Sequence, residues 1–179
     1  MHIMDIFQNA ISANATLISL DIVEDTHANL MRLEIGDNGI GMSQQMQRQV
    51  TDPFFTTRTL RKIGLGIPLL KQNAERTGGF FRLESEEGIG TRVIAQFVLD
   101  HLDRPVLGDV PGIMVLAVMA NPQIGFTYTH LKDKKLYRFS SMEVKEALGD
   151  IPVNEPMVYK YLHEMITENL EATGVTLTS

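Results

Sequence analysis

Four short segments alternate between apolar and polar residues, and this alternation constrains the fold more than any other feature of the chain. In residues 17–23 every second side chain is apolar, and residues 30–35 repeat the pattern. Residues 80–85 and 92–99 form a second pair, joined by a turn that contains two glycines. A period of two with one apolar face is typical of sheets that bury only one side. We therefore predict a mixed, mostly antiparallel sheet with helices on one face.

The segments around these strands show the period of amphipathic helices. Residues 3–15 carry a broad apolar face, and Ser43 is a good N-cap for a short helix. A longer helix begins near Gly64, has Pro68 in its first turn and ends at two glycines, residues 78–79. The pattern after residue 100 predicts helices at residues 112–120, 142–148 and 156–172, and a hairpin of residues 126–130 and 135–139.

The chain divides into two parts of different character. Residues 1–99 are dense in glycine turns and alternating strands, whereas residues 100–179 are not, and the polar, proline-containing residues 100–111 separate them. We predict that the second part is a small α+β extension that packs on the first. The apolar stripe of residues 156–172 is expected to pack against its own domain.

Composition excludes several classes of function. The 179 residues include no cysteine, which excludes disulfides, thiolate zinc sites and cysteine nucleophiles. A formal net charge of −6 argues against a broad nucleic-acid-binding surface, but it is compatible with a small basic pocket for phosphates. No apolar run approaches the roughly 20 residues that a membrane helix needs, and the N-terminus does not match a signal peptide. We therefore expect a cytoplasmic protein without membrane contact.

Asp5 and Asn9 are four residues apart on the first predicted helix, so their side chains share one face. An amide oxygen can complete a Mg²⁺ shell built from waters and phosphate oxygens. A neighbouring carboxylate can orient or deprotonate a water or a hydroxyl. The alternative is a solvated helix face, but such faces are usually rich in Lys, Glu and Arg. This face also carries Gln8 and Ser12, which favours a polar pocket.

The sequence Asp-Asn-Gly-Ile-Gly-Met at residues 37–42 follows directly after a predicted strand. Glycine permits positive φ and lets a ligand approach the backbone closely. The carboxylate of Asp37, held at the strand end, can accept a hydrogen bond from an exocyclic amine such as that of adenine. Taken alone, the motif is also compatible with an ordinary Asn-Gly turn.

Three cations, Arg58, Arg61 and Lys62, precede the Gly-Leu-Gly of residues 64–66 that opens a predicted helix. Unpaired backbone N–H groups at a helix N-terminus attract anions, and a basic cluster in an acidic protein strengthens that interpretation. The alternative is a solvated loop. A fourth motif, Gly-Ile-Gly-Thr at residues 88–91, is predicted to be a hairpin turn with a supporting hydroxyl.

The order and spacing of these four motifs resemble the ATP-binding domain shared by DNA gyrase, the ninety-kilodalton heat-shock chaperones, histidine kinases and MutL mismatch-repair proteins, the GHKL superfamily. The stretch MDIFQNAISANATLISLDI is closest to the MutL form, and DNGIGM resembles the first glycine motif. From Asp52 onward, DPFFTT, GLGIPLLKQNAERTGGFF and GIGTRVIAQF look more like histidine kinases. The resemblance covers residues 3–98 and implies the Bergerat fold, a two-layer α/β sandwich.

The resemblance also implies a role for each matching position. Asn9 would ligate Mg²⁺, Asp37 would bind the adenine amino group, and Thr91 would support the adenine end. Gly39 and Gly41 would let the nucleotide approach the backbone. Backbone N–H groups of Gly64, Leu65 and Gly66 would contact the phosphates. As our own addition, the basic side chains of Arg58, Arg61 and Lys62 would contact them as well.

Two positions depart from the family pattern. Lys62 stands where histidine kinases usually have a further glycine, so a point charge replaces a backbone contact. Asp5 stands where the ATPases and serine kinases of the superfamily usually have glutamate, and histidine kinases seldom have an acid there. Asp5 therefore favours an ATPase or a serine kinase over a histidine kinase.

Three functions are compatible with this sequence. The first is a protein that binds Mg²⁺ and ATP and hydrolyses ATP slowly, with Asp5 positioning the water and a lid at residues 42–64 closing over the nucleotide. The second is a serine protein kinase of the anti-sigma-factor type, in which Asp5 activates a hydroxyl of a partner. The third is a non-catalytic switch, in which ATP orders the lid and residues 100–179 relay this to a protein partner.

Overall fold

The alternating segments form strands of a six-stranded sheet in the computed structural model, which describes residues 2–51 and 65–175. The elements in chain order are α1 (Ile3–Ser12), β1 (Leu17–Asp25), β2 (Leu30–Asp37), α2 (Gln44–Val50), α3 (Gly66–Arg76), β3 (Phe80–Glu86), β4 (Gly90–Val98), α4 (Val110–Ala120), β5 (Gly125–Lys132), β6 (Lys135–Ser140), α5 (Ser141–Leu148) and α6 (Pro156–Ala172). Within these residues no helix is long and apolar enough to cross a membrane.

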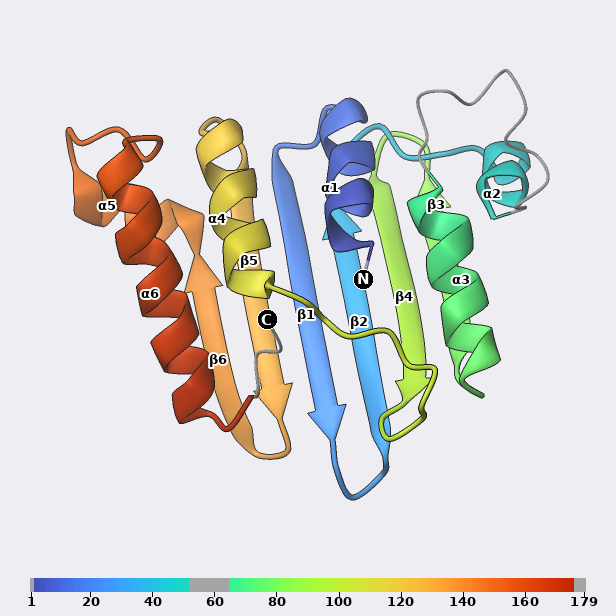
Figure 1. Cartoon of the computed structure of the whole chain (residues 1–179). Coiled ribbons are helices and arrows are strands. Elements are labelled where there is room, and N and C mark those ends of the chain that lie inside the picture. Colours follow the sequence, from blue (N-terminus) through green and yellow to red (C-terminus); the bar gives the residue numbers. More distant parts are fainter. Residues whose placement is uncertain (1, 52–64, 176–179) are drawn as a thin grey trace.

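The strands lie in the order β3-β4-β2-β1-β5-β6, and α1, α3, α4 and α6 all lie on the same face (Figure 1). The pairs β1–β2, β2–β4, β3–β4 and β5–β6 are antiparallel, whereas β1 and β5 run parallel. The predicted α+β sandwich with a mixed, mostly antiparallel sheet is therefore confirmed.

The buried face of the sheet is the one that the alternation predicts. Ile18, Leu20 and Ile22 of β1 are completely buried, and β2 and β4 also bury alternate residues. α1 covers this face with Phe7 and its apolar neighbours, but Met4, which was predicted to lie on the same apolar face, is exposed. The apolar arc of α1 is wider than the strip of sheet that the helix covers.

The part after residue 100 continues the sheet instead of packing on it as a separate layer. β5 pairs with β1 along its whole length, from Leu17 opposite Gly125 to Glu24 opposite Lys132. α4 is apolar almost all round and buries seven of its residues, five of which belong to the same apolar core. The two parts of the chain therefore share one sheet and one core.

The outermost helix packs on its own domain, as predicted. α6 buries a stripe of four residues against α4 and β6, namely Val158, Leu162, Ile166 and Leu170. His163 on the same helix lies 3.2 Å from the carboxylate of Asp109, and Asp109 caps α4 by accepting a hydrogen bond from the N–H of Gly112. One carboxylate therefore stabilises the start of α4 and its contact with α6.

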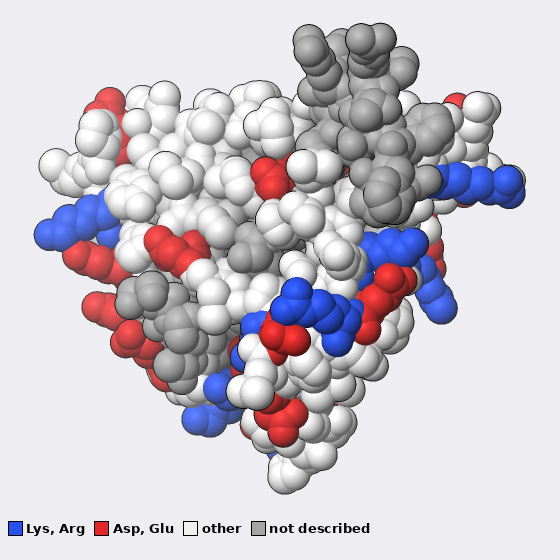
Figure 2. Space-filling model, turned by 45° about the vertical axis from the view of Figure 1, so that its right-hand side comes forward, with Lys and Arg blue, Asp and Glu red and all other residues white. Residues whose placement is uncertain are grey.

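The connection from β4 to α4 crosses the helix-covered face of the sheet (Figure 1). The Asn29 side chain donates a hydrogen bond to Asp100 over 2.7 Å, and the guanidinium of Arg76 lies 2.9 Å from the carboxylate of Asp103. Acidic and basic side chains lie next to one another in the lower half of the face shown in Figure 2. Polar contacts at the surface therefore hold this connection against the sheet.

A chain of buried polar groups joins β1 to β5. Tyr128 and His130 of β5 are almost completely buried, and the Tyr128 hydroxyl lies 2.7 Å from Nδ1 of His130. The other ring nitrogen, Nε2, lies 2.9 Å from a carboxylate oxygen of Glu24. The hydrogen bond from His130 is the main cause that lowers the pKa of the Glu24 carboxyl below its ordinary value.

We expect Glu24→Gln to lower the free energy of unfolding at neutral pH by about 1–2 kcal/mol, because a hydrogen bond to a charged group becomes a neutral one. Since the pKa of Glu24 is lower in the folded than in the unfolded chain, its contribution is complete above the unfolded pKa. That contribution disappears as the pH falls through the folded pKa. Urea denaturation across acidic pH should show a flatter pH dependence for the variant.

The matched control is Glu164→Gln on α6, where the carboxylate is exposed and lies 3.7 Å from Lys160. An exposed pair contributes little, so this variant should keep the wild-type pH dependence. Equal pH profiles for wild type and Glu24→Gln would contradict the assignment.

Candidate functional site

A cavity of about 300 Å³ lies between α1, α2, α3 and the ends of β2 and β4. Four of the residues predicted to contact a nucleotide line it together: Asn9, Asp37, Gly41 and Thr91. Its walls are otherwise mostly apolar and are formed by Ile6, Ala10, Ile40, Met42, Met46, Ile67 and Val93. An apolar pocket with a few convergent polar groups is the usual form of a small-molecule site.

Asp37 is the strongest acceptor in this cavity. It ends β2 and lies opposite Thr91 of β4, and its carboxylate accepts a hydrogen bond from the N–H of Gly39 over 2.8 Å. Burial raises the pKa of the Asp37 carboxyl above its ordinary value, although the backbone N–H groups of Gly39 and Thr91 act in the opposite direction. A half-buried carboxylate at a strand end is well placed to accept a hydrogen bond from an amine of a ligand.

The backbone after Asp37 is fixed at both sides. The N–H of Ile40 donates to the carbonyl of Ala13 at the end of α1 over 2.9 Å, and the carbonyl of Ile40 accepts from Gly88 of the β3–β4 turn over 2.8 Å. Gly39 packs against α1, since a Cβ there would come within 2.6 Å of the Ala13 oxygen. The motif therefore packs between the end of α1 and the β3–β4 hairpin. The lack of a side chain at Gly39 allows this close packing beside the cavity.

At Gly41, a lining residue of the cavity, only glycine fits. Its φ is +68°, and a Cβ there would lie 1.9 Å from the carbonyl oxygen of Glu86. Backbone strain and a clash with another backbone would both oppose any larger residue. The close approach of this turn to β3 shapes the floor of the cavity.

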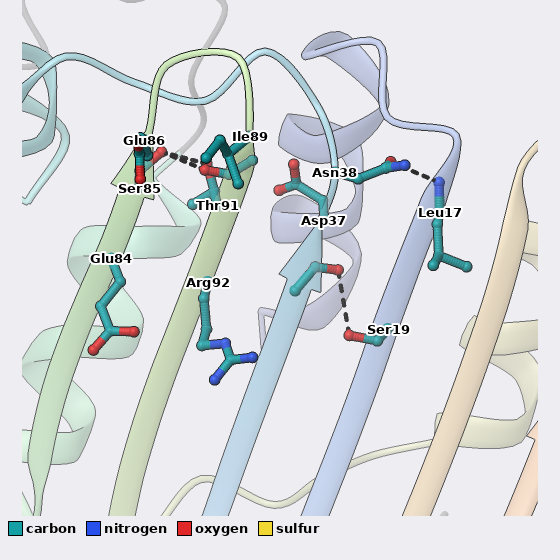
Figure 3. A pocket seen from close by; sticks show the side chains of 12 residues that line it. Leu17, Ser19, Asp37, Asn38, Glu84, Ser85, Glu86, Ile89, Thr91 and Arg92 are labelled. Carbon is teal, nitrogen blue, oxygen red and sulfur yellow. Dashed lines mark hydrogen bonds between the residues drawn. The ribbon is translucent and has the colours of Figure 1, made fainter.

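Two residues that the sequence analysis missed support this region. The Ser85 hydroxyl lies 2.8 Å from the Thr91 hydroxyl and accepts a hydrogen bond from the N–H of Met42 over 2.8 Å. The Gln47 amide donates to the carbonyls of Met42 and Ser85, which attaches α2 to the same site. Figure 3 shows Ser85 and Thr91 side by side on β3 and β4, next to Asp37. The predicted hairpin register could have identified Ser85, because it places this residue opposite Thr91.

Asn9 presents a buried polar atom that has no hydrogen-bond partner among the described residues. Its Nδ2 is buried and makes no hydrogen bond with the part of the chain that the structure describes. Leaving such a group unsatisfied is costly, so a ligand that pairs with it gains affinity. Nitrogen and oxygen of an amide are interchangeable by a flip, so this side chain can also present its oxygen to a cation.

A metal ion at Asn9 would need most of its ligands from elsewhere. No group of three or more His, Cys, Asp or Glu side chains is suitably placed for a metal among residues 2–51 and 65–175. Mg²⁺ commonly keeps several waters and binds phosphate oxygens, with only one or two ligands from the protein. The donor set therefore fits a cation that arrives together with a phosphate-bearing ligand.

Asp5 lies outside the cavity, at the contact between α1 and α3. Its side chain is 54% exposed, and one carboxylate oxygen lies 3.2 Å from Nδ1 of His2. A Cβ on Gly66 would come within 2.6 Å of the Asp5 Cβ, so the first turn of α3 approaches this residue closely. Leu65 stands at the N-cap position of that helix without a side-chain capping hydrogen bond, and it is exposed. The other predicted phosphate contacts, Arg58, Arg61, Lys62 and Gly64, lie outside the described residues.

A second cavity of about 480 Å³ lies on the face of the sheet that carries no helices, the face seen in Figure 3. It is larger, but neither Asn9 nor Gly41 lines it, and the exposed charges of Glu84 and Arg92 border it. The smaller cavity brings together polar groups from three separate motifs. We therefore assign the candidate site to the smaller cavity.

The contact of Gly41 with β3 leads to a prediction about stability. We expect Gly41→Ala to lower the free energy of unfolding by about 3 kcal/mol or more, because the methyl group adds a backbone clash to the strained φ. The control is Gly88→Ala, where φ is +80° but no atom lies within 4 Å of the added Cβ. That variant should lose only about 1 kcal/mol. Equal losses in urea denaturation would show that the Gly41 turn relaxes.

Comparisons with known proteins agree with this geometry. The profile of the family described as histidine kinase-, DNA gyrase B- and HSP90-like ATPases matches residues 2–101. A putative sensor protein of Shewanella frigidimarina is 35% identical over 104 residues, which is 56% of this chain and 16% of that protein. Sensor protein DegM of a Bacillus species is 29% identical over 55% of this chain and 26% of its own length.

A third relative is the autoinducer 2 sensor kinase/phosphatase LuxQ of Vibrio cholerae, which is 28% identical over 49% of this chain and 11% of its own length. The chain thus covers about a quarter or less of each of these three relatives. The region matched by the family profile runs from α1 to the end of β4 and contains all the candidate site residues.

Proposed function

The chain belongs to the family of histidine kinase-, DNA gyrase B- and HSP90-like ATPases, and on that premise we propose that the cavity beside α1 binds ATP together with Mg²⁺. ATP binding is a property of the family. The observation that carries the proposal for this site is the convergence of Asn9, Asp37, Gly41 and Thr91 on one cavity with apolar walls.

Each group has a distinct task in this proposal. The Asp37 carboxylate accepts a hydrogen bond from the exocyclic amine of adenine, and the apolar walls contact the faces of the base. Asn9 directs its amide toward the phosphates and toward Mg²⁺, which supplies positive charge against the phosphate oxygens when it is bound. Gly41 lets the turn after β2 approach β3 closely, which shapes the floor of the cavity.

We further propose that the protein hydrolyses ATP slowly, with Asp5 orienting the attacking water. This rests on the position of Asp5 one helical turn before Asn9 and against the first turn of α3. His2 holds one carboxylate oxygen of Asp5, which restricts its orientation. The predicted closure of residues 42–64 belongs to the same proposal, and most of that segment lies outside the described residues.

The exposure of Asp5 favours one alternative, transfer of phosphate to a protein hydroxyl. A carboxylate that is 54% exposed at the surface is accessible to a serine of a partner as well as to water. Such a partner, for this function or for a non-catalytic switch, would contact residues 100–179 or the segment 42–64. A cytoplasmic location remains part of the proposal.

Asp37→Asn should weaken ATP binding by about tenfold or more, because the asparagine amide replaces a charged acceptor with a weaker one. The wild type should also prefer ATP to GTP, since guanine has a carbonyl where adenine has the amine, and the variant should lose this preference. Calorimetry with both nucleotides and Mg²⁺ measures the two effects. Because burial raises the pKa of Asp37, wild-type affinity should fall as the pH is lowered through that raised value.

The control for this variant is Asp21→Asn on β1, which points away from the helices and does not line the cavity. It should bind both nucleotides as the wild type does. Unchanged ATP affinity in Asp37→Asn would contradict the assignment of the adenine contact.

Asp5→Asn should leave ATP affinity intact and reduce phosphate release by roughly 10²–10⁴-fold, the usual contribution of a general base. Phosphate release from Mg²⁺ and ATP by the purified chain measures this, with Asp21→Asn again as the control. Full turnover in Asp5→Asn would remove Asp5 from the mechanism. ATP binding without any release by the wild type would refute hydrolysis and leave phosphate transfer or a switch.

A further inference from the structure

A separate cavity of about 290 Å³ lies at the end of the sheet opposite to Asp37 and Thr91. It lies between the connection that precedes α4 and the ends of β1 and β5. Arg104 reaches it from the connection and Lys132 from β5, so two cations from distant parts of the chain meet there. It shares no lining residue with the proposed nucleotide cavity.

Both cations are held in place by the protein. The Lys132 ammonium donates to the carbonyl of Gly174 over 2.7 Å and lies 3.7 Å from Glu24, and its side chain is only 21% exposed. Nε of Arg104 donates to the carbonyl of Leu99 over 2.6 Å, which fixes the plane of the guanidinium. These contacts orient the two groups before any ligand arrives, which reduces the entropy lost on binding.

The charges that line the cavity do not cancel. Among the described residues that line the cavity Glu24 is the one acid, and one of its oxygens is already held by His130. The lining thus holds two cations against one carboxylate, and the exposed carboxylate of Asp133, which interacts electrostatically with Lys132, offsets part of the excess positive charge. A half-buried excess charge is stabilised by a counter-ion, in this case an anion.

Two acidic residues near this cavity, Asp25 and Asp133, accept hydrogen bonds in the turns at this end of the sheet. The Asp25 carboxylate accepts from the N–H of Ala28 over 2.7 Å. The Asp133 carboxylate accepts from the N–H and the hydroxyl of Thr26 over 2.8 and 2.9 Å. Neither Asp25 nor Asp133 lines the cavity.

The rest of the lining limits the kind of anion. Leu99 and Leu107 provide apolar walls beside the cations. A volume of about 290 Å³ corresponds to roughly ten water molecules of about 30 Å³ each, which suits a ligand with a short chain.

We propose that this cavity binds a small organic anion, with its carboxylate or phosphate group between Arg104 and Lys132 and its short aliphatic body against Leu99 and Leu107. The terminal nitrogens Nη1 and Nη2 of Arg104 provide N–H donors for the oxygens of either headgroup, although Nη1 also lies 3.5 Å from the sulfur of Met31. Lys132 provides a point charge. The site is independent of ATP binding.

The test is calorimetry on the full chain without nucleotide, using isocaproate, isopentyl phosphate and the neutral isocaproamide. At least one anion should bind and the amide should not, and comparison of the two anions identifies the preferred headgroup. Arg104→Gln and Lys132→Gln should each weaken binding by about tenfold or more. Lys134→Gln in the same hairpin is the control, because Lys134 does not line the cavity, and it should bind as the wild type does.

Three results would overturn the proposal: neither anion binds, the amide binds as well as the anions do, or both cation variants keep wild-type affinity. Circular dichroism establishes that the variants are folded, and because they alter different elements, a folding defect in one leaves the other informative. Asp37→Asn should bind the anion normally, so a failure of the nucleotide assignment can be distinguished from a failure here.

Discussion

The close approach of the turn after β2 to the β3–β4 hairpin is the constraint on which the proposed nucleotide cavity depends. Because Gly41 has no side chain, its backbone can pass the carbonyl of Glu86 at a distance that excludes even a methyl group. Hydrogen bonds of Ile40 to Ala13 and Gly88 then fix the turn between α1 and the hairpin. The position of this turn sets the distance between the helix that carries Asn9 and the strand ends that carry the acceptors.

Strand register creates both of the polar sites. Antiparallel pairing of β2 with β4 places Asp37 opposite Thr91 at one end of the sheet. Parallel pairing of β1 with β5 places Glu24 opposite Lys132 at the other end. A slip of one residue in either pair would turn these side chains to the opposite face. The apolar core between the two ends holds the register, so the same buried residues that stabilise the fold also position the charges.

Much of the fold follows from local sequence patterns. The pairing of strands that are distant in the sequence does not. The period-two segments and the helix periods locate the elements because burial of one face is encoded residue by residue. Nothing in the local pattern of β5 indicates that its neighbour is β1, because amphipathic alternation does not specify a partner strand. The motifs predicted Asn9, Asp37, Gly41 and Thr91 as site residues, and these four line one cavity. The apolar walls contributed by α2 and α3 depend instead on how those helices pack.

Because residues 1–99 and residues 100–179 share one core, the second part of the chain is structurally coupled to the first. Phe7 of α1, which lies two residues before Asn9, packs on Phe126 of β5 with ring centroids 5.8 Å apart. Removal of residues 100–179 would therefore take away β5, one of the two strands that pair with β1, and expose the part of α1 that packs on Phe126. The proposed contact of residues 100–179 with a partner therefore has to be tested by substituting single surface residues, since α1 and β5 are parts of one packed unit.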